Sequence, residues 1–280
     1  MSDPVFTLRR GKRPLLVSLP HSGTEIPEAM QGDYVPHALE VEDTDWHLAS
    51  LYAFAKHIGA SLIAPRTSRY VIDLNRPPDN APMYPGANNT ELCPTRSFSG
   101  VPIYKEGQAP DAVEIEFRRR TYWQPYHDAL AAEIERIKAK HGYVVLWDGH
   151  SIKSELPWLF EGKLPDLNLG TAGGTSCAPA LAAAFGHVLA TQDRFTHVVD
   201  GRFKGGYITR HYGRPDDNVH AVQLEMCFSC YMLEEPPYMV DAGRAGRLLP
   251  VLRSLLLTAL ACDLTSPSPI GAPGAATGFA

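Results

Sequence analysis

Several features are absent from this chain of 280 residues, and each absence excludes a class of protein. No stretch of the sequence has the length and apolarity of a membrane-spanning helix, so we expect no membrane partner. The first residues, Met1 to Arg13, are short, polar and basic, and they lack the apolar stretch of a secretory signal. We therefore expect a cytoplasmic protein.

Cysteine and net positive charge are also scarce. The chain has 5 cysteines, an odd and scattered set that does not resemble a disulfide framework and that suits a reducing compartment. Cys227 and Cys230 lack a second pair that would complete a zinc knuckle, so we interpret them as buried thiols. The formal net charge of -5 gives no electrostatic footprint for nucleic acid, and we expect none as a partner. The sequence indicates no particular oligomeric state.

Extended and helical patterns alternate along the chain, which predicts one α/β domain over residues 14–264, with a mixed sheet flanked by helices. The Pro, Gly and Ala in 265–280 predict a disordered tail, and residues 1–13 are interpreted as an N-terminal segment. Extended runs are expected at 15–19, 61–64, 70–74, 143–147, 196–199, 206–209 and 221–227, and helices at 45–58, 111–140, 178–190 and 240–264, with bends at Pro125 and Pro250.

One long segment, residues 77–110, is rich in Pro, Gly, Asn and Ser. Loops of this length inside a compact domain usually carry function or form a lid. We therefore expect this segment to contribute to a functional site.

Polar side chains follow or end three of the expected strands. His21 comes after 15–19, His150 comes after 143–147, and Glu225 lies within the apolar run 221–227. Ligands of α/β proteins bind at the carboxyl ends of strands. Two imidazoles and a carboxylate at such ends suit a hydrolytic metal site with an open coordination position.

Two histidines are too few to hold a metal ion, so a third ligand is needed. The nearest candidates lie in the acidic run 42–45, just before the first expected helix. Asp45 is the first choice and Asp43 the second, while the alternative for Asp45 is a plain helix N-cap. Glu225 fits the base that takes a proton from water, unless it faces solvent at a sheet edge. Asp148 is either a partner that orients a histidine or a turn residue before Gly149.

Arginines on either side of the run 70–74 suggest an anion-binding site. Arg76 with Asn75, and Arg69 before them, have the planar and amide donors that bind a carboxylate. The alternative for Arg76 is a structural salt bridge with Asp73 or Asp79.

Arg210 supplies a second cationic position, in a glycine-containing segment that lets a ligand approach the backbone. A small substrate with two carboxylates would use both positions. The sequence does not indicate which arginine binds which carboxylate.

Six motifs occur in order along the chain, at residues 17–23, 43–46, 68–76, 148–151, 204–213 and 223–226. Together they resemble the N-formylglutamate amidohydrolase family, and the resemblance runs from about residue 14 to 260. It implies a phosphorylase/hydrolase-like α/β fold akin to zinc carboxypeptidases and zinc-dependent muramoyl-alanine amidases. It also implies hydrolysis of N-formyl-L-glutamate to formate and L-glutamate, the last step of a histidine degradation route.

The resemblance also implies roles for individual residues. His21, Asp45 and His150 stand in the order of the zinc ligands, and Glu225 stands in the position of the base. The Asn75-Arg76 pair resembles the Asn-Arg pair that binds a terminal carboxylate in carboxypeptidases. Two other functions stay open: a zinc amidohydrolase or peptidase acting on another N-acyl amino acid, and a non-catalytic protein that binds an acidic amino-acid derivative.

Overall fold

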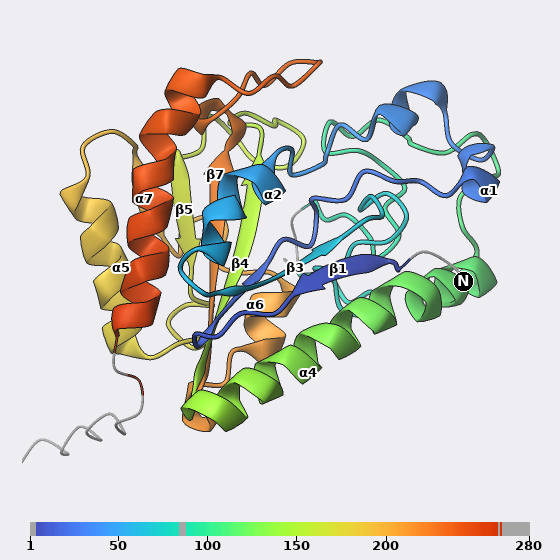
Figure 1. The fold of residues 1–280 in the computed structure, drawn as a ribbon. Coiled ribbons are helices and arrows are strands. Elements are labelled where there is room, and N and C mark those ends of the chain that lie inside the picture. The colour runs from blue at the N-terminus through green and yellow to red at the C-terminus, as the bar shows by residue number, and fades with distance from the viewer. Residues whose placement is uncertain (1–3, 84–87, 263, 265–280) are drawn as a thin grey trace, which may run out of the picture.

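A mixed sheet of seven strands forms the centre of the molecule, which we describe from a computed structural model covering residues 4–83, 88–262 and 264 (Figure 1). The strand order is β1-β3-β2-β4-β7-β5-β6. The four central strands β3, β2, β4 and β7 run parallel, β1 is antiparallel to β3, and β5 is antiparallel to β7. The α/β fold predicted from the sequence is confirmed. The strands are β1 (Phe6–Arg9), β2 (Leu15–Ser18), β3 (Ser61–Pro65), β4 (Val144–Ile152), β5 (Leu167–Gly170), β6 (His197–Val199) and β7 (Val219–Cys227).

Helices cover both faces of this sheet, with α5 and α7 on one side and α4 on the other (Figure 1). Alternate side chains of β4 enter the two separate cores. Trp147 packs with α2, α5 and α7, whereas Leu146 packs with α4 and α6. This alternation is what a strand buried on both faces requires. The helices are α1 (Glu28–Gln31), α2 (Leu48–Leu51), α3 (Ala112–Arg118), α4 (Gln124–His141), α5 (Pro179–Thr191), α6 (Tyr207–Tyr212) and α7 (Ala242–Ala261).

The longest helical segment matches the prediction over 111–140 closely. Asp111 caps it by accepting hydrogen bonds from the backbone N–H groups of Val113 and Glu114, and Gly142 ends it with a φ of 81°. A π-helical turn, Arg119–Trp123, joins α3 to α4 directly before Pro125. Proline has no N–H to complete the regular ladder, so the irregular turn lies where the sequence predicted a bend. The other proline, Pro250, is accommodated inside a continuous α7.

The run 70–74, which we predicted as a strand, forms turns instead. Its backbone bonds are local or reach the long loop: Val71 N–H donates to Ser68 O, and Asp73 N–H donates to Leu92 O. Val71, Ile72 and Leu74 are buried in the core beneath α4. The apolar pattern therefore reflects burial rather than strand pairing.

The second wrong element is 206–209, predicted as extended and found as the start of α6. Asn75 explains this outcome, because its side-chain oxygen accepts a hydrogen bond from Ile208 N–H at 2.8 Å. A distant residue thus satisfies a donor at the helix start, which a local pattern does not reveal. The strands β1 and β5 were not predicted, and β1 lies within the segment 1–13.

Three further predictions concern partners and the tail. None of the helices in the described ranges is long and apolar enough to cross a membrane. Cys227 and Cys230 are buried thiols, as predicted, and no disulfide joins any cysteines of the described residues. The tail predicted at 265–280 lies outside the described residues.

Candidate metal centre and its pocket

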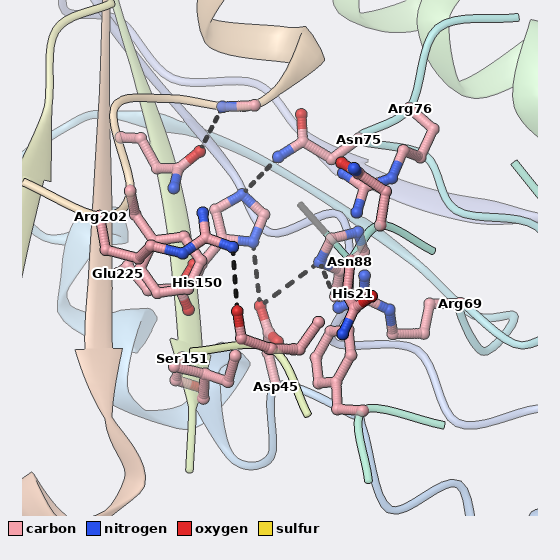
Figure 2. Close-up of a pocket in the computed structure, with 17 residues that line it drawn as sticks. His21, Asp45, Arg69, Asn75, Arg76, Asn88, His150, Ser151, Arg202 and Glu225 are labelled. Atoms are coloured by element: carbon pink, nitrogen blue, oxygen red, sulfur yellow. Dashed lines mark hydrogen bonds and ion pairs between the residues drawn. The ribbon is translucent and has the colours of Figure 1, made fainter. Parts of the chain in front are cut away.

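His21, Asp45 and His150 meet at the carboxyl ends of the central strands (Figure 2). One ligand atom from each of the three lies within 4.8 Å of the others, and all three side chains are buried. The cluster contains Asp45 and not Asp43, whose carboxylate instead accepts a hydrogen bond of 2.7 Å from Phe98 N–H. Of the two aspartates that the sequence left open, Asp45 is the one that lies in this cluster.

The backbone brings these ligands together through close contacts. Asp45 N–H donates to His21 O at 2.9 Å, which ties the two segments to each other. Gly23 lies so near the neighbouring chain that a Cβ there would stand 2.2 Å from Thr67 O, so this turn requires glycine. Asp45 does not act as a plain helix cap, since His47 occupies the N-cap position of α2.

A buried carboxylate holds the far nitrogen of each histidine. His21 Nε2 lies 2.7 Å from Asp73 Oδ1, and His150 Nε2 lies 3.2 Å from Asp148 Oδ2. The Nδ1 atoms face Asp45 Oδ2, at 3.9 Å for His21 and 3.2 Å for His150. Metal-binding histidines are typically oriented in this way, with one nitrogen on a carboxylate and the other directed to the ion.

The cluster fits a divalent metal ion on its own geometry. Asp45 Oδ2 is buried and accepts no hydrogen bond from the described residues, which is costly for a carboxylate oxygen. A cation held between the two imidazoles and this carboxylate would satisfy the Asp45 oxygen. Two imidazoles and one carboxylate, with a further position open, form a donor set found in catalytic zinc sites.

The two histidines differ in their electrostatic surroundings. Burial and the nearby Arg69 guanidinium lower the pKa of His21. Burial also disfavours charge on His150, but the carboxylates of Asp148 and Asp45 outweigh it and raise the pKa of this histidine well above its usual value. The groups around His150 therefore favour a positive charge more strongly than the groups around His21 do.

Glu225 lies beside this cluster on β7, an interior strand between β4 and β5. It is in register with His150 on the adjacent strand, and it lines the same pocket. The alternative position at a solvent-facing sheet edge is therefore wrong. Burial, with a smaller contribution from the nearby Asp45 carboxylate, raises the pKa of Glu225 to about 8. A carboxyl group with such a pKa can accept and release a proton near neutral pH.

The pocket above the cluster has a volume of about 70 Å³. Its wall includes Asn88, Asn89 and Phe98, so the segment 77–110 contributes to the site as expected. Seven of the eight site residues predicted from the sequence line it: His21, Asp45, Arg69, Asn75, Arg76, His150 and Glu225.

Arg69 and Asn75 are largely occupied in holding the cluster. Arg69 donates to Asp73 Oδ2 at 2.6 Å, and its guanidinium lies 4.3 Å from the centre of the Phe98 ring. Asn75 Nδ2 lies 3.0 Å from His150 Nε2, while its oxygen binds α6. Both side chains therefore position other groups, in addition to facing the pocket.

Arg76 is held by the long loop. Its Nε donates to Thr90 O and its terminal nitrogen donates to Thr90 Oγ1, each at 2.9 Å. Its charge adds to those of Arg69 and His21 in holding the pKa of the buried Asp73 well below its usual value. Arg76 nevertheless lines the pocket and presents a cation there.

Arg210 is the predicted site residue that the structure does not bring to the pocket wall. It is exposed on α6, and its Nε donates to Gly205 O at 2.8 Å. Because 207–212 is helical rather than extended, Gly206 reaches the pocket but Arg210 does not. Arg202 lines the pocket instead, and sequence reasoning missed it. The sequence feature that could have indicated Arg202 is its position two residues before the motif 204–213.

The sequence comparisons agree on one family. Residues 13–232 match the family model described as N-formylglutamate amidohydrolase. Two curated relatives, both called N-formylglutamate deformylase, come from Pseudomonas aeruginosa and Pseudomonas putida. They are 49% and 47% identical to this chain over 259 residues, covering 92% of the chain and 97% of each relative.

Solved structures share the fold. The crystal structure of N-formylglutamate amidohydrolase from Ralstonia eutropha JMP134 matches with a TM-score of 0.75 and 26% identity, covering 91% of this chain and 96% of that one. A gene product of Agrobacterium tumefaciens matches with a TM-score of 0.69, covering 92% and 95% of the two chains. At 18% identity, this second match indicates the fold alone.

Proposed function

This chain belongs to the N-formylglutamate amidohydrolase family, and we propose that it hydrolyses N-formyl-L-glutamate to formate and L-glutamate. The observation that carries the proposal is the buried cluster of His21, Asp45 and His150 with Glu225 beside it in one pocket. Both curated relatives carry the name of this deformylase activity, which supports the choice of substrate.

We further propose that the cluster would hold one Zn²⁺ ion, with His21, Asp45 and His150 as its ligands. Zinc bound there would supply Lewis-acid chemistry, since it makes water more acidic and polarises a carbonyl group. Asp73 and Asp148 hold the two imidazole rings in place for this role.

Glu225 acts as the base and then as the acid. Its carboxylate takes a proton from the attacking water, whose oxygen forms the new bond to the formyl carbon. It then gives the proton to the nitrogen of glutamate as the carbon–nitrogen bond breaks, so formate and the free amine leave. The register of β4 and β7 holds this carboxylate beside the metal ligands throughout.

Cationic side chains anchor the substrate. Arg76 and Arg69 face the pocket beside the cluster, and we assign them to substrate carboxylates. Asn75 positions His150. The small pocket and its positive side chains favour a compact dianion over a long polymer. Fixing both ends of the substrate holds the formyl carbon at the reacting position.

We assign the reaction to the last step of a histidine degradation route on the family resemblance alone. We expect the enzyme in the cytoplasm, in keeping with five cysteines that form no disulfide.

The test is a formate-release assay on purified protein, combined with metal analysis. We expect release from N-formyl-L-glutamate to exceed that from N-formyl-L-aspartate and N-acetyl-L-glutamate. We also expect about one zinc per chain and loss of activity in chelator. Preference for another N-acyl amino acid would favour a related amidohydrolase, and binding without turnover would favour the non-catalytic alternative.

A further inference from the structure

Arg202 reaches the pocket from a part of the fold that supplies none of the metal ligands. It lies in the segment 200–206, between β6 and α6. Figure 2 shows Arg202 and Glu225 on one side of the two histidines, with Arg69 and Arg76 on the other. The pocket is therefore lined by arginines on two sides.

The segment that carries Arg202 is anchored at both ends. Asp200 accepts hydrogen bonds from Thr171 N–H and Gly173 N–H at its start, and Gly206 N–H donates to Gln223 Oε1 at its end. The segment also packs closely against β6, since a Cβ at Gly201 would stand 2.9 Å from the Val198 side chain. The backbone at Arg202 is thus held by contacts on either side.

Arg202 itself is also positioned. Its terminal nitrogen donates to Leu159 O at 3.2 Å, and its guanidinium lies 5.4 Å from the centre of the Phe203 ring. Leu159 and Phe203 both line the pocket. A guanidinium has five N–H donors, so it can hold this carbonyl and bind a carboxylate at once. Such preorganisation lowers the entropy that binding would otherwise cost.

We propose that Arg202 binds one of the two carboxylates of the substrate and makes the site selective for dianions. The inference rests on the proposed function and deepens it. Arg69 and Arg76 hold the other carboxylate from the opposite side, so the substrate lies across the metal cluster.

A competing role for Arg202 is to neutralise Glu225, which lies on the same side. The cations that most lower the pKa of Glu225 are His150 and Arg69, and burial still raises that pKa to about 8. Neutralisation would affect every substrate equally, whereas a carboxylate contact would affect only substrates that carry the carboxylate.

The experiment compares Arg202→Met and Arg202→Lys with wild type on three substrates. These are N-formyl-L-glutamate, N-formyl-L-glutamine and the α-amide of N-formyl-L-glutamate, so each amide lacks one negative charge. Arg194→Met is the matched control, because Arg194 is exposed and lies outside the pocket. Arg210→Met tests the arginine that the sequence suggested. Metal content and melting temperature are measured for every variant.

We expect Arg202→Met to lower kcat/KM on N-formyl-L-glutamate by about 10- to 100-fold, mainly through KM. On one of the two amides the loss should fall below about threefold, because the contact is already missing there, and that amide identifies the carboxylate. Arg202→Lys should recover part of the loss. Arg194→Met and Arg210→Met should behave as wild type.

Equal losses on all three substrates would overturn the proposal, as would no loss at all or a charge-selective loss in Arg210→Met instead. Calorimetric binding of L-glutamate, L-glutamine and L-isoglutamine repeats the comparison without turnover. A wild-type protein inactive on all three formyl compounds would therefore refute the proposed function. In that case the binding data would still support a carboxylate contact of Arg202 if its substitution weakened the binding of L-glutamate more than that of one of the two amides. Any other pattern would overturn the contact.

Discussion

The cluster of candidate metal ligands and the cationic rim of the same pocket are built in different ways. The cluster, His21, Asp45 and His150, is buried and held by other side chains. The rim, Arg76 and Arg202, comes from segments outside the helices and strands. Its two guanidinium groups are tied largely to backbone carbonyls, those of Thr90 and Leu159.

This difference separates two tasks within one pocket. Sheet register and buried carboxylates set the cluster, so its geometry is rigid and suits metal binding and proton transfer. The positions of the rim arginines depend on loop packing. Loops vary more readily than strands, so a change in substrate preference would alter the rim first. Substitutions in the cluster should therefore change metal content or kcat, and substitutions in the rim should change KM.

The largest effect should come from removing a ligand of the cluster. His150→Ala deletes one imidazole and leaves Asp45 and Asp148 facing each other without a cation. We expect stoichiometric metal to be lost and kcat/KM to fall by at least about a thousandfold, since metal catalysis contributes several kcal/mol. Elemental analysis and the formate assay measure both, with the exposed His187→Ala as control. A variant that retained metal and activity would remove His150 from the site.

Next in size is Glu225→Gln, which keeps the shape of the side chain and removes its basicity. We expect metal content to stay near wild type while kcat falls by about 10²- to 10⁴-fold. The control is the exposed Glu235→Gln. A nearly normal kcat would contradict the role of Glu225 as base, and loss of metal would indicate that it is a ligand instead.

The third prediction concerns Asp73 and Asp148, the carboxylates that contact the two histidines of the cluster. Asp148→Asn should weaken metal affinity by about 10- to 100-fold, measured by competition with a chromogenic chelator. Asp73→Asn should do the same and also destabilise the fold by about 3 kcal/mol, because buried Arg69 loses its partner. Unchanged affinity in both variants would mean that these carboxylates do not orient the ligands.

The rim should respond differently. Arg76→Met is expected to raise KM for N-formyl-L-glutamate by about tenfold, because it removes a charged donor, while kcat and metal content change little. Steady-state kinetics with metal analysis measure this. A fall in metal content would show that cluster and rim are not independent.

The smallest effect concerns the pH dependence of stability, to which the buried His127 contributes. His127 is buried on α4, with Nε2 2.9 Å from Leu74 O, and burial lowers its pKa to about 3. The unfolded chain takes up this proton below about pH 6.5 and the folded chain does not, so stability falls as the pH drops through that range. Between pH 7 and 5, His127 should contribute about 2 kcal/mol of this loss.

The measurement is urea unfolding with chelator present, comparing wild type with His127→Gln at both pH values. The variant should lose less stability than wild type on acidification. Equal losses would mean that folding does not lower the pKa of His127.

The pocket residues on strands were predictable from the sequence, and those on loops were less so. His150 and Glu225 stand out because a polar side chain in an apolar run is costly unless it is paired or functional. Asp43 and Asp45 lie in one acidic run, so only the path of the turn before α2 distinguishes them.

The remaining errors have a common physical cause. The run 70–74 and the segment 206–209 take their conformation from contacts with distant residues, above all Asn75 and the long loop. Arg202 was missed for the same reason, because the path of 200–206 depends on anchors at Thr171 and Gln223. Local patterns predict which segments are buried, but not which distant segment they meet.

The pairing of His150 with Glu225 on adjacent parallel strands also limits how this protein can evolve. Side chains alternate along a strand, so inserting or deleting one residue upstream in β4 or β7 would turn either His150 or Glu225 to the opposite face. Lineages of this fold should therefore vary freely in loop length, while length changes inside these two strands are eliminated by selection.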